Sequence, residues 1–483
     1  MTDADNRTRW LALYVLCLGS LMIVLDVTIV NVALPSIRED LGFSETSLAW
    51  VVNAYLLTYG GFLLLGGRLG DLFGHRKLFL AGIALFTLAS LACGLSTTQW
   101  MLVTARTVQG VGGAVASAVS LSLMMTLFTE PAERAKAMGL FGFVAAGGGS
   151  IGVLLGGVLT DLISWHWIFL VNVPIGVLVC LLSLRLLPRE RASAMSGRLD
   201  VAGALTVTAA LMLAVYAIVN GNQNGWTSAE TLGLLGGAVV LLALFLGIES
   251  RVQSPLVPLG LFRLRNLRVS NLVGVLWAAA MFAWFFLSAL YLQLVLGYSP
   301  LQVGLAFLPS NLIMGAFSIG LSAKLVMRFG FRKPLAIGLL LAAAGLALFV
   351  RAPVDGTFLV DVLPSMILLG VGAGMAFNPV LLAAMSDVEP SEAGLASGLV
   401  NTSFLMGGAL GLAVLASVAS SRSHTLRLGG AGELSALTGG YHIAFLVGAA
   451  FAAAAAVIGG TLLRENPAAA HEPAQGAPAA EIS

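Results

Sequence analysis

The chain has 483 residues, of which 58% are hydrophobic and only 10% are charged, and its formal net charge is +2. Soluble domains carry about 25% charged residues, so this composition excludes a soluble protein, and the small net charge gives no reason to expect a nucleic-acid partner. Repeated apolar stretches of about 20 residues predict an all-α membrane protein, because β-barrel strands would alternate.

Charge clusters and Gly/Pro clusters divide the chain into fourteen predicted spans. The first apolar run contains Asp26 and has no small-residue cleavage site, so it is interpreted as a retained span and not as a secretory signal. The predicted spans are 11–34, 48–70, 78–96, 100–127, 137–160, 167–187, 201–219, 231–249, 270–292, 303–326, 334–352, 361–385, 394–419 and 442–463.

The basic residues predict how the chain is oriented. An even number of spans places both termini on one side, and twenty of the 25 Lys and Arg residues fall on that side, against four on the other. The positive-inside rule therefore predicts cytoplasmic termini and a multi-pass protein of the cell inner (plasma) membrane. The segment after Arg464 is rich in Ala, Pro and Glu, which predicts a disordered cytoplasmic tail.

Two loops form an internal repeat. "GGRLGDLFGHRK" (66–77) follows the second span, and "SAKLVMRFGFRK" (322–333) follows the tenth, with five identical residues in register. This predicts two six-helix bundles with two additional helices between them. The predicted divisions are an N-terminus at 1–10, a first bundle at 11–187, two linker helices at 201–249, a second bundle at 270–463 and a tail at 464–483.

Asp26 is the one acidic residue predicted to lie well inside a span. An aspartate there costs about 2.5–3.5 kcal/mol on insertion scales, so it is expected to face a cavity or a partner. One interpretation is a structural hydrogen bond to a neighbouring helix. The other, which we favour, is a carboxylate that takes up and releases a proton, or that binds a cation.

Arg106 is predicted to lie at nearly the depth of Asp26. It shares one helical stripe with Gln109, Gly110 and Gly113, which follow at i+3, i+4 and i+7. A guanidinium in a membrane needs an anionic or carbonyl partner. The sequence leaves open whether Arg106 pairs with Asp26 or is only its neighbour.

Aromatic and amide side chains within the spans are candidates for a wide, mostly apolar substrate cavity. Asn31 is also expected to bond to another helix. The cavity candidates are Asn31, Tyr55, Gln109, Trp277, Trp284, Tyr291, Gln293, Asn311, Phe377, Asn378, Asn401 and Phe404.

The motifs that mark ATP-driven or catalytic proteins are missing from the sequence. It has no nucleotide-binding loop, no metal-ligand spacing and no nucleophile elbow, so we expect no enzyme, no metal and no cofactor.

Four motifs carry a resemblance to a known family. "LDVTIVNVALP" (25–35), "GGRLGDLFGHRK", "RTVQGVGGA" (106–114) and "WHWIFLVNVPIG" (165–176) occur in order on the expected spans. Over residues 10–463 the chain resembles the fourteen-span drug:proton antiporters of the major facilitator superfamily. The resemblance implies the major facilitator fold.

The resemblance also implies roles for particular residues. It implies proton relay for Arg106 with Asp26. For the loop after the second span it implies a role in gating, in which Asp71 caps a helix end. The gating residues it indicates are Arg68, Asp71, Gly74, Arg76, Gly148, Gly152 and Gly156. The chain departs from the antiporter pattern at Val153, where the family carries proline.

The expected function is proton-coupled efflux of hydrophobic or cationic organic compounds by alternating access, in a protein that acts as a monomer. Its partners are then small-molecule substrates, protons and the lipid bilayer. Two alternatives stay open at this point. One is a dedicated exporter of a single endogenous metabolite, such as an antibiotic or a siderophore, and the other is a lipid-handling or uncoupled membrane protein.

Overall fold

The computed structural model describes residues 3–465 apart from 45, 129, 189–199, 253–254 and 390–391. The predicted tail therefore lies almost entirely outside the described residues. The helices of the first part are α1 (Asp3–Leu41), η1 (Ser47–Ala49), α2 (Trp50–Phe73), α3 (His75–Gly94), α4 (Gln99–Leu127), α5 (Pro131–Leu162), α6 (Trp167–Leu170), α7 (Asn172–Leu186), α8 (Val201–Asn224) and α9 (Ala229–Glu249).

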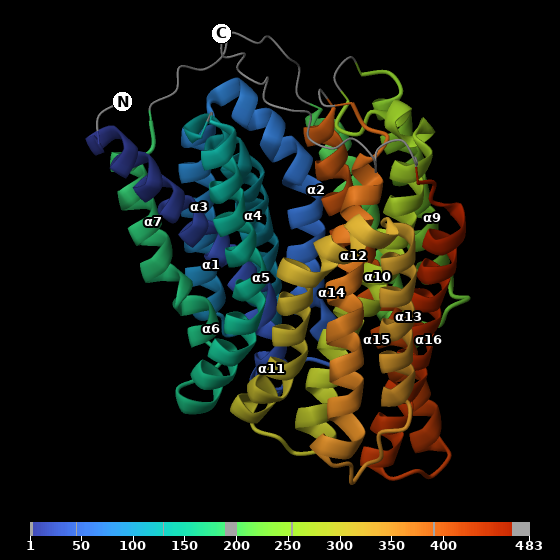
Figure 1. Cartoon of the computed structure of the whole chain (residues 1–483). Helices are drawn as coiled ribbons and strands as arrows, with labels where there is room; N and C mark the ends of the chain where they lie inside the picture. Colours follow the sequence, from blue (N-terminus) through green and yellow to red (C-terminus); the bar gives the residue numbers. More distant parts are fainter. Residues whose placement is uncertain are drawn as a thin grey trace, which may run out of the picture.

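The second part continues the all-helical pattern, with three short π-helical turns. Its helices are η2 (Leu259–Arg263), α10 (Arg265–Leu290), η3 (Tyr291–Val295), α11 (Pro300–Ala316), η4 (Phe317–Leu321), α12 (Ser322–Phe329), α13 (Arg332–Phe349), η5 (Phe358–Val362), α14 (Leu363–Met385), α15 (Ala393–Leu428) and α16 (Glu433–Leu462). Figure 1 shows the blue-to-teal helices on the left and the yellow-to-red helices on the right. Both chain ends lie at the top of that view, which we call the terminal side.

Within the described residues, twelve helices are long and apolar enough to cross a membrane. The predicted fourteen spans are therefore not confirmed. The span predicted at 137–160 falls in α5, where the described apolar helix is Ile151–Leu162, and the span predicted at 303–326 is divided into α11, η4 and α12. The physical reason in the second case is length, because the 17 residues of α11 extend about 26 Å, short of a hydrocarbon core of about 30 Å.

Glycines of α5 allow it to pack closely against α1. A Cβ atom at Gly152 would lie 2.1 Å from Thr28 Oγ1, and one at Gly156 would lie 2.6 Å from the Ile29 carbonyl oxygen. Gly148 meets Val24 on the same face of α1. The predicted glycine ridge is thus confirmed as a packing surface, whereas its part in gating stays a prediction.

The two repeated loops each contain a glycine with a positive φ angle. Gly74 ends α2 with φ of +93°, and Gly330 ends α12 with φ of +72°. Only glycine adopts this region readily, which explains why both repeats keep it. In each repeat the next helix, α3 or α13, starts within two residues.

The two halves meet on the side opposite the termini. There α5 packs against α11, and a Cβ atom at Gly157 would lie 2.6 Å from the Pro300 carbonyl oxygen. Gln293 Nε2 also donates to the Val32 carbonyl oxygen of α1 at 2.9 Å. These contacts close the molecule on that side.

The two predicted linker helices are present as α8 and α9. α8 packs against α2 and α15, and Gly61 of α2 lies directly against Thr208. Only 17% of the apolar window of α9 is buried, so this helix presents most of its surface to lipid. The domain divisions themselves stay a prediction.

Candidate functional site

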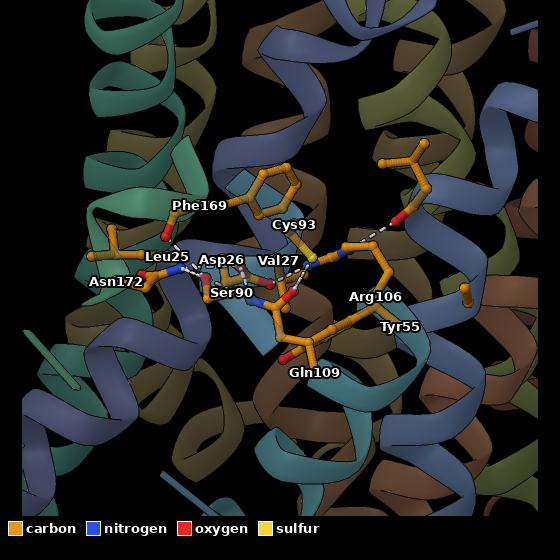
Figure 2. Close-up of polar contacts among 12 residues, drawn as sticks. Leu25, Asp26, Val27, Tyr55, Ser90, Cys93, Arg106, Gln109, Phe169 and Asn172 are labelled. Atoms are coloured by element: carbon orange, nitrogen blue, oxygen red, sulfur yellow. Dashed lines mark hydrogen bonds and ion pairs between the residues drawn. The ribbon is translucent and has the colours of Figure 1, made fainter. Parts of the chain in front are cut away.

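Asp26 and Arg106 form a buried ion pair between α1 and α4. Arg106 Nη1 donates to Asp26 Oδ2 at 2.5 Å, and the two side chains are 0% and 1% exposed. Figure 2 shows the carboxylate and the guanidinium pointing toward one another. The question that the sequence left open is answered: Arg106 is the partner of Asp26. The pair is closed off by the first half of the molecule and does not line an open cavity.

Three polar side chains complete the shell around Asp26. Gln109 Nε2 and Asn172 Nδ2 donate to Asp26 Oδ1 at 2.7 Å and 3.2 Å. Both also donate to Ser90 Oγ, which in turn donates to the Phe169 carbonyl oxygen. In the described structure, each hydrogen bond that the Asp26 oxygens accept comes from an N–H donor, which is the pattern that suits a carboxylate acting only as an acceptor.

Arg106 is held by more than the carboxylate. Its Nε donates to the Val51 carbonyl oxygen at 2.9 Å, and its Nη1 donates to Gln109 Oε1 at 2.7 Å. The guanidinium carbon lies 4.4 Å from the Tyr55 ring centroid and 5.5 Å from that of Phe169. The positive charge is therefore surrounded by a carboxylate, carbonyl oxygens and π faces in place of water.

The sequence places these groups by simple helical geometry. Arg106 and Gln109 are three residues apart on α4 and so project from one face. Asn172 begins α7 directly after the short helix α6, which carries Phe169 into contact with Ser90. Four elements, α1, α3, α4 and the α6–α7 junction, thus converge on one carboxylate.

Two members of this network were missed in the sequence analysis, Ser90 and Asn172. Asn172 gave a signal, because it is the single amide in the apolar stretch "WIFLVNVPIG" (167–176). Ser90 gave none, because serines are ordinary in membrane helices.

The predicted cavity residues do not form a single group. Gln109 belongs to the Asp26 network, and the Tyr55 ring lies against Arg106. Asn31 donates to the Val27 and Thr28 carbonyl oxygens of its own helix, so the expected bond to another helix is wrong. The physical reason is that a short amide side chain reaches the carbonyl oxygens one turn back more easily than a neighbouring helix.

The remaining candidates lie mainly in the second half. Tyr291 Oη donates to the Pro353 carbonyl oxygen, Asn378 Nδ2 donates to that of Ser318, and the exposed Asn401 bonds within its own helix. Trp277, Trp284 and Asn311 are buried, and each has a side-chain N–H group without a partner among the described residues.

Two of the predicted aromatics do come together. The Phe404 ring on α15 lies 6.1 Å from Phe377 on α14 and 6.0 Å from Phe282 on α10, in edge-to-face contact. Phe377 is 50% exposed, so this aromatic cluster has an accessible face.

The predicted gating residues of the loop after the second span lie where α2 ends and α3 begins, on the terminal side. Arg76 Nη2 donates to the Leu184 carbonyl oxygen near the end of α7 at 2.6 Å, whereas Nε of the half-buried Arg68 has no partner among the described residues. Asp71 is outside the residues whose side chains the structure describes, so its capping role stays a prediction. In the part of the chain that is described, no group of three or more His, Cys, Asp or Glu residues has the geometry of a metal site.

Comparison with known families identifies the scaffold. The pattern described as "Major Facilitator Superfamily" matches residues 16–412. The chain belongs to the Major Facilitator Superfamily. Its members are transporters and not enzymes, and the twelve apolar helices agree with a multi-pass membrane protein.

Several curated Major Facilitator proteins are similar over most of the chain. The puromycin resistance protein pur8 of Streptomyces alboniger is 42% identical over 86% of this chain and 83% of its own length. The cephamycin export protein CmcT of Amycolatopsis lactamdurans is 39% identical over 94% and 93%. The lincomycin resistance protein of Streptomyces lincolnensis is 38% identical over 86% of each chain.

Solved structures agree on the fold. A bacterial homologue of the human lysosomal transporter Spinster superposes with a TM-score of 0.66 and 17% identity, covering 95% of this chain and 99% of the other. The xylose transporter XylE from E. coli gives a TM-score of 0.60 with 15% identity, covering 93% and 97%. At these identities the likeness supports the Major Facilitator fold alone.

Proposed function

We propose that this Major Facilitator protein exports hydrophobic or cationic organic compounds in exchange for protons. The observation that carries the proposal is the fully buried Asp26–Arg106 pair, in a chain whose relatives are named for resistance and export. A buried acid in a membrane transporter is a default candidate for proton coupling. Protons are then the driving partner, and no cofactor is needed.

The charge balance of the pair suggests how a proton would change the conformation. Ionised Asp26 neutralises Arg106, and a proton on Asp26 would leave the guanidinium unpaired in a dry site. Breaking such a pair costs about 3–5 kcal/mol. A shift of about 5.5 kcal/mol takes a two-state equilibrium from 1:99 to 99:1, so this cost moves such an equilibrium most of that way and favours alternating access.

The subfamily, the orientation and the oligomeric state of the protein are also proposed. We place the chain in the fourteen-span drug:proton antiporter subfamily, counting α5 and the α11–α12 segment as the two further spans. Both termini would be cytoplasmic in the plasma membrane, in agreement with the distribution of Lys and Arg. The protein would act as a monomer.

The accessible aromatic cluster supports apolar or amphipathic substrates. Phe282, Phe377 and Phe404 offer ring faces and edges from three helices of the second half. Such surfaces bind planar apolar groups and organic cations without strict geometry.

A dedicated exporter of one metabolite is the second candidate. The specific observation in its favour is the similarity to CmcT, whose name describes export of cephamycin and which this chain matches over 93% of its length. A competition panel separates the two candidates. A multidrug pump is inhibited by many unrelated compounds, whereas a dedicated exporter is inhibited only by close analogues of one.

Transport by proteoliposomes under an imposed pH gradient tests the coupling. The wild type should move substrate against its concentration gradient. The pH of the lumen should change at the same time, in the direction expected when protons move opposite to the substrate. The doubly substituted Asp26→Asn/Arg106→Gln protein keeps the site uncharged and should lose coupled transport while still binding substrate. Glu433→Gln, an exposed carboxyl at the start of α16, is the matched control and should transport normally.

Undiminished proton-coupled transport by the double variant would overturn the proposal. Substrate movement by the wild type without any pH change would instead indicate the uncoupled, lipid-handling alternative.

A further inference from the structure

A second pair of buried acids lies outside the Asp26 network, where the two linker helices end. Asp200 caps the start of α8, and Glu249 is the last residue of α9. The two side chains are 4% and 3% exposed. The carboxyl groups lie within hydrogen-bonding reach of one another.

Each carboxyl group has one oxygen satisfied and one oxygen without a donor. Asp200 Oδ1 accepts from Gly203 N at 2.7 Å, and Glu249 Oε2 accepts from Val257 N at 3.2 Å. Asp200 Oδ2 and Glu249 Oε1 are buried, and neither has a hydrogen-bond donor among the described residues. Two ionised carboxylates cannot supply that donor, because neither carries a hydrogen atom.

The described residues around the two carboxyl groups offer no cation that balances their two negative charges. Leu65 of α2, Ala204 of α8 and Leu256 form an apolar cluster at these helix ends. Arg251 directly after α9 and Arg68 on α2 make no ion pair with Glu249 in the described structure. α8 carries no charged residue, and the only other charged residue of α9, Glu230, lies at its opposite end.

We propose that Asp200 and Glu249 form a second proton-binding site, in which one carboxyl group carries a proton and donates it to the other. The shared proton supplies the donor that both unpaired oxygens lack and leaves one negative charge where two would repel. The site is separate from the proposed coupling at Asp26 and does not depend on it.

The position of the site gives the proton a structural consequence. α8 packs against α2 through Gly61 and Thr208, and Leu256 joins Leu65 of α2 in one apolar cluster. Loss of the proton would place two negative charges in contact and would push the ends of α8 and α9 apart. The linker pair would then loosen from α2 as the pH rises.

Infrared difference spectroscopy tests the proton directly. At neutral pH the purified wild type should show the carbonyl band of a protonated carboxyl group that is missing from Glu249→Gln and equally from Asp200→Asn. Both amides keep the accepting oxygen and replace the shared proton with a permanent N–H donor, so both variants should fold. Glu230→Gln removes an exposed carboxyl from the same helix and should leave the band unchanged.

Thermal unfolding in detergent gives a second readout. The folded wild type holds a proton that the unfolded chain has already released above a pH of about 4.5, so its stability should fall as the pH rises from about 4.5 to about 7. Glu249→Gln and Asp200→Asn should lose that part of the slope, a difference of several degrees in Tm, whereas Glu230→Gln should keep it. Identical infrared spectra and identical pH slopes for all four proteins would overturn the proposal.

Discussion

At the scale of single residues, the Asp26–Arg106 pair behaves as one neutral unit. Its stability depends on both charges being present, because each is fully buried and the other is its counter-ion. An amide at position 26 would leave Arg106 as an uncompensated buried charge, so Asp26→Asn is expected to weaken folding.

A double-mutant cycle measures this coupling. Asp26→Asn alone should destabilise the protein by about 3–5 kcal/mol. The combined Asp26→Asn/Arg106→Gln protein should be more stable than Asp26→Asn, because the substitution of both removes the unpaired charge. Unfolding in detergent is the measurement, and strictly additive effects would contradict the pairing.

Gln109 is expected to stabilise the Asp26–Arg106 pair through its hydrogen bonds. Gln109→Leu removes a 2.7 Å bond to Asp26 Oδ1 and a 2.7 Å bond from Arg106 Nη1. Leaving such buried groups unsatisfied costs about 1–3 kcal/mol. Gln302→Leu is a useful contrast, because it removes only a capping contact at the exposed start of α11. An equal loss of stability in both variants would contradict a special role for Gln109.

At the scale of helices, the α5–α11 contact depends on the absence of side chains. Gly157→Ala places a methyl group 2.6 Å from the Pro300 carbonyl oxygen, a backbone atom that cannot turn away. The helices must separate, so the side opposite the termini should open more often. A cysteine introduced near that contact should therefore react with a thiol reagent at a higher rate.

Gly233→Ala on α9 is the matched control for this helix contact. An added Cβ atom there meets nothing within 4 Å, and alanine favours a helix over glycine by about 1 kcal/mol. In the Gly233→Ala control, the introduced cysteine should react at the same rate as in the wild type, and the protein should be no less stable. Unchanged labelling in Gly157→Ala would show that the contact does not hold that side closed.

At the scale of the whole molecule, the described state is closed on the side opposite the termini, with Asp26 paired to Arg106. Acidification should therefore shift the population away from this state, because a proton on Asp26 opposes the Arg106 pair. Spin or fluorescent labels at the exposed Ile163 and at Tyr298, one in each half, should move apart at low pH. The same labels on the Asp26→Asn/Arg106→Gln background should not respond, and a pH response that survives there would assign the switch to other groups.

The local sequence by itself determined the membrane class, most of the helix positions, the repeated loop glycines and the choice of Asp26 and Arg106. These features are local, because hydropathy is a property of a stretch of chain and an acid in an apolar run stands out without its neighbours. The fourteen spans predicted from hydropathy are not confirmed within the described residues, because a π-helical turn follows α11 in a stretch whose sequence is continuously apolar.

Only the tertiary structure decided which polar groups meet. In the structure Asp26 pairs with Arg106, and Ser90 and Asn172 belong to the same network. Gln109 lies in that network and not in the expected cavity, and Asn31 bonds to its own helix. The tertiary structure also brought together Asp200 and Glu249, which are 49 residues apart in the sequence. The physical reason is that a span's sequence fixes its length and its apolar faces, whereas the neighbour that each polar side chain reaches depends on helix rotation and packing against other spans.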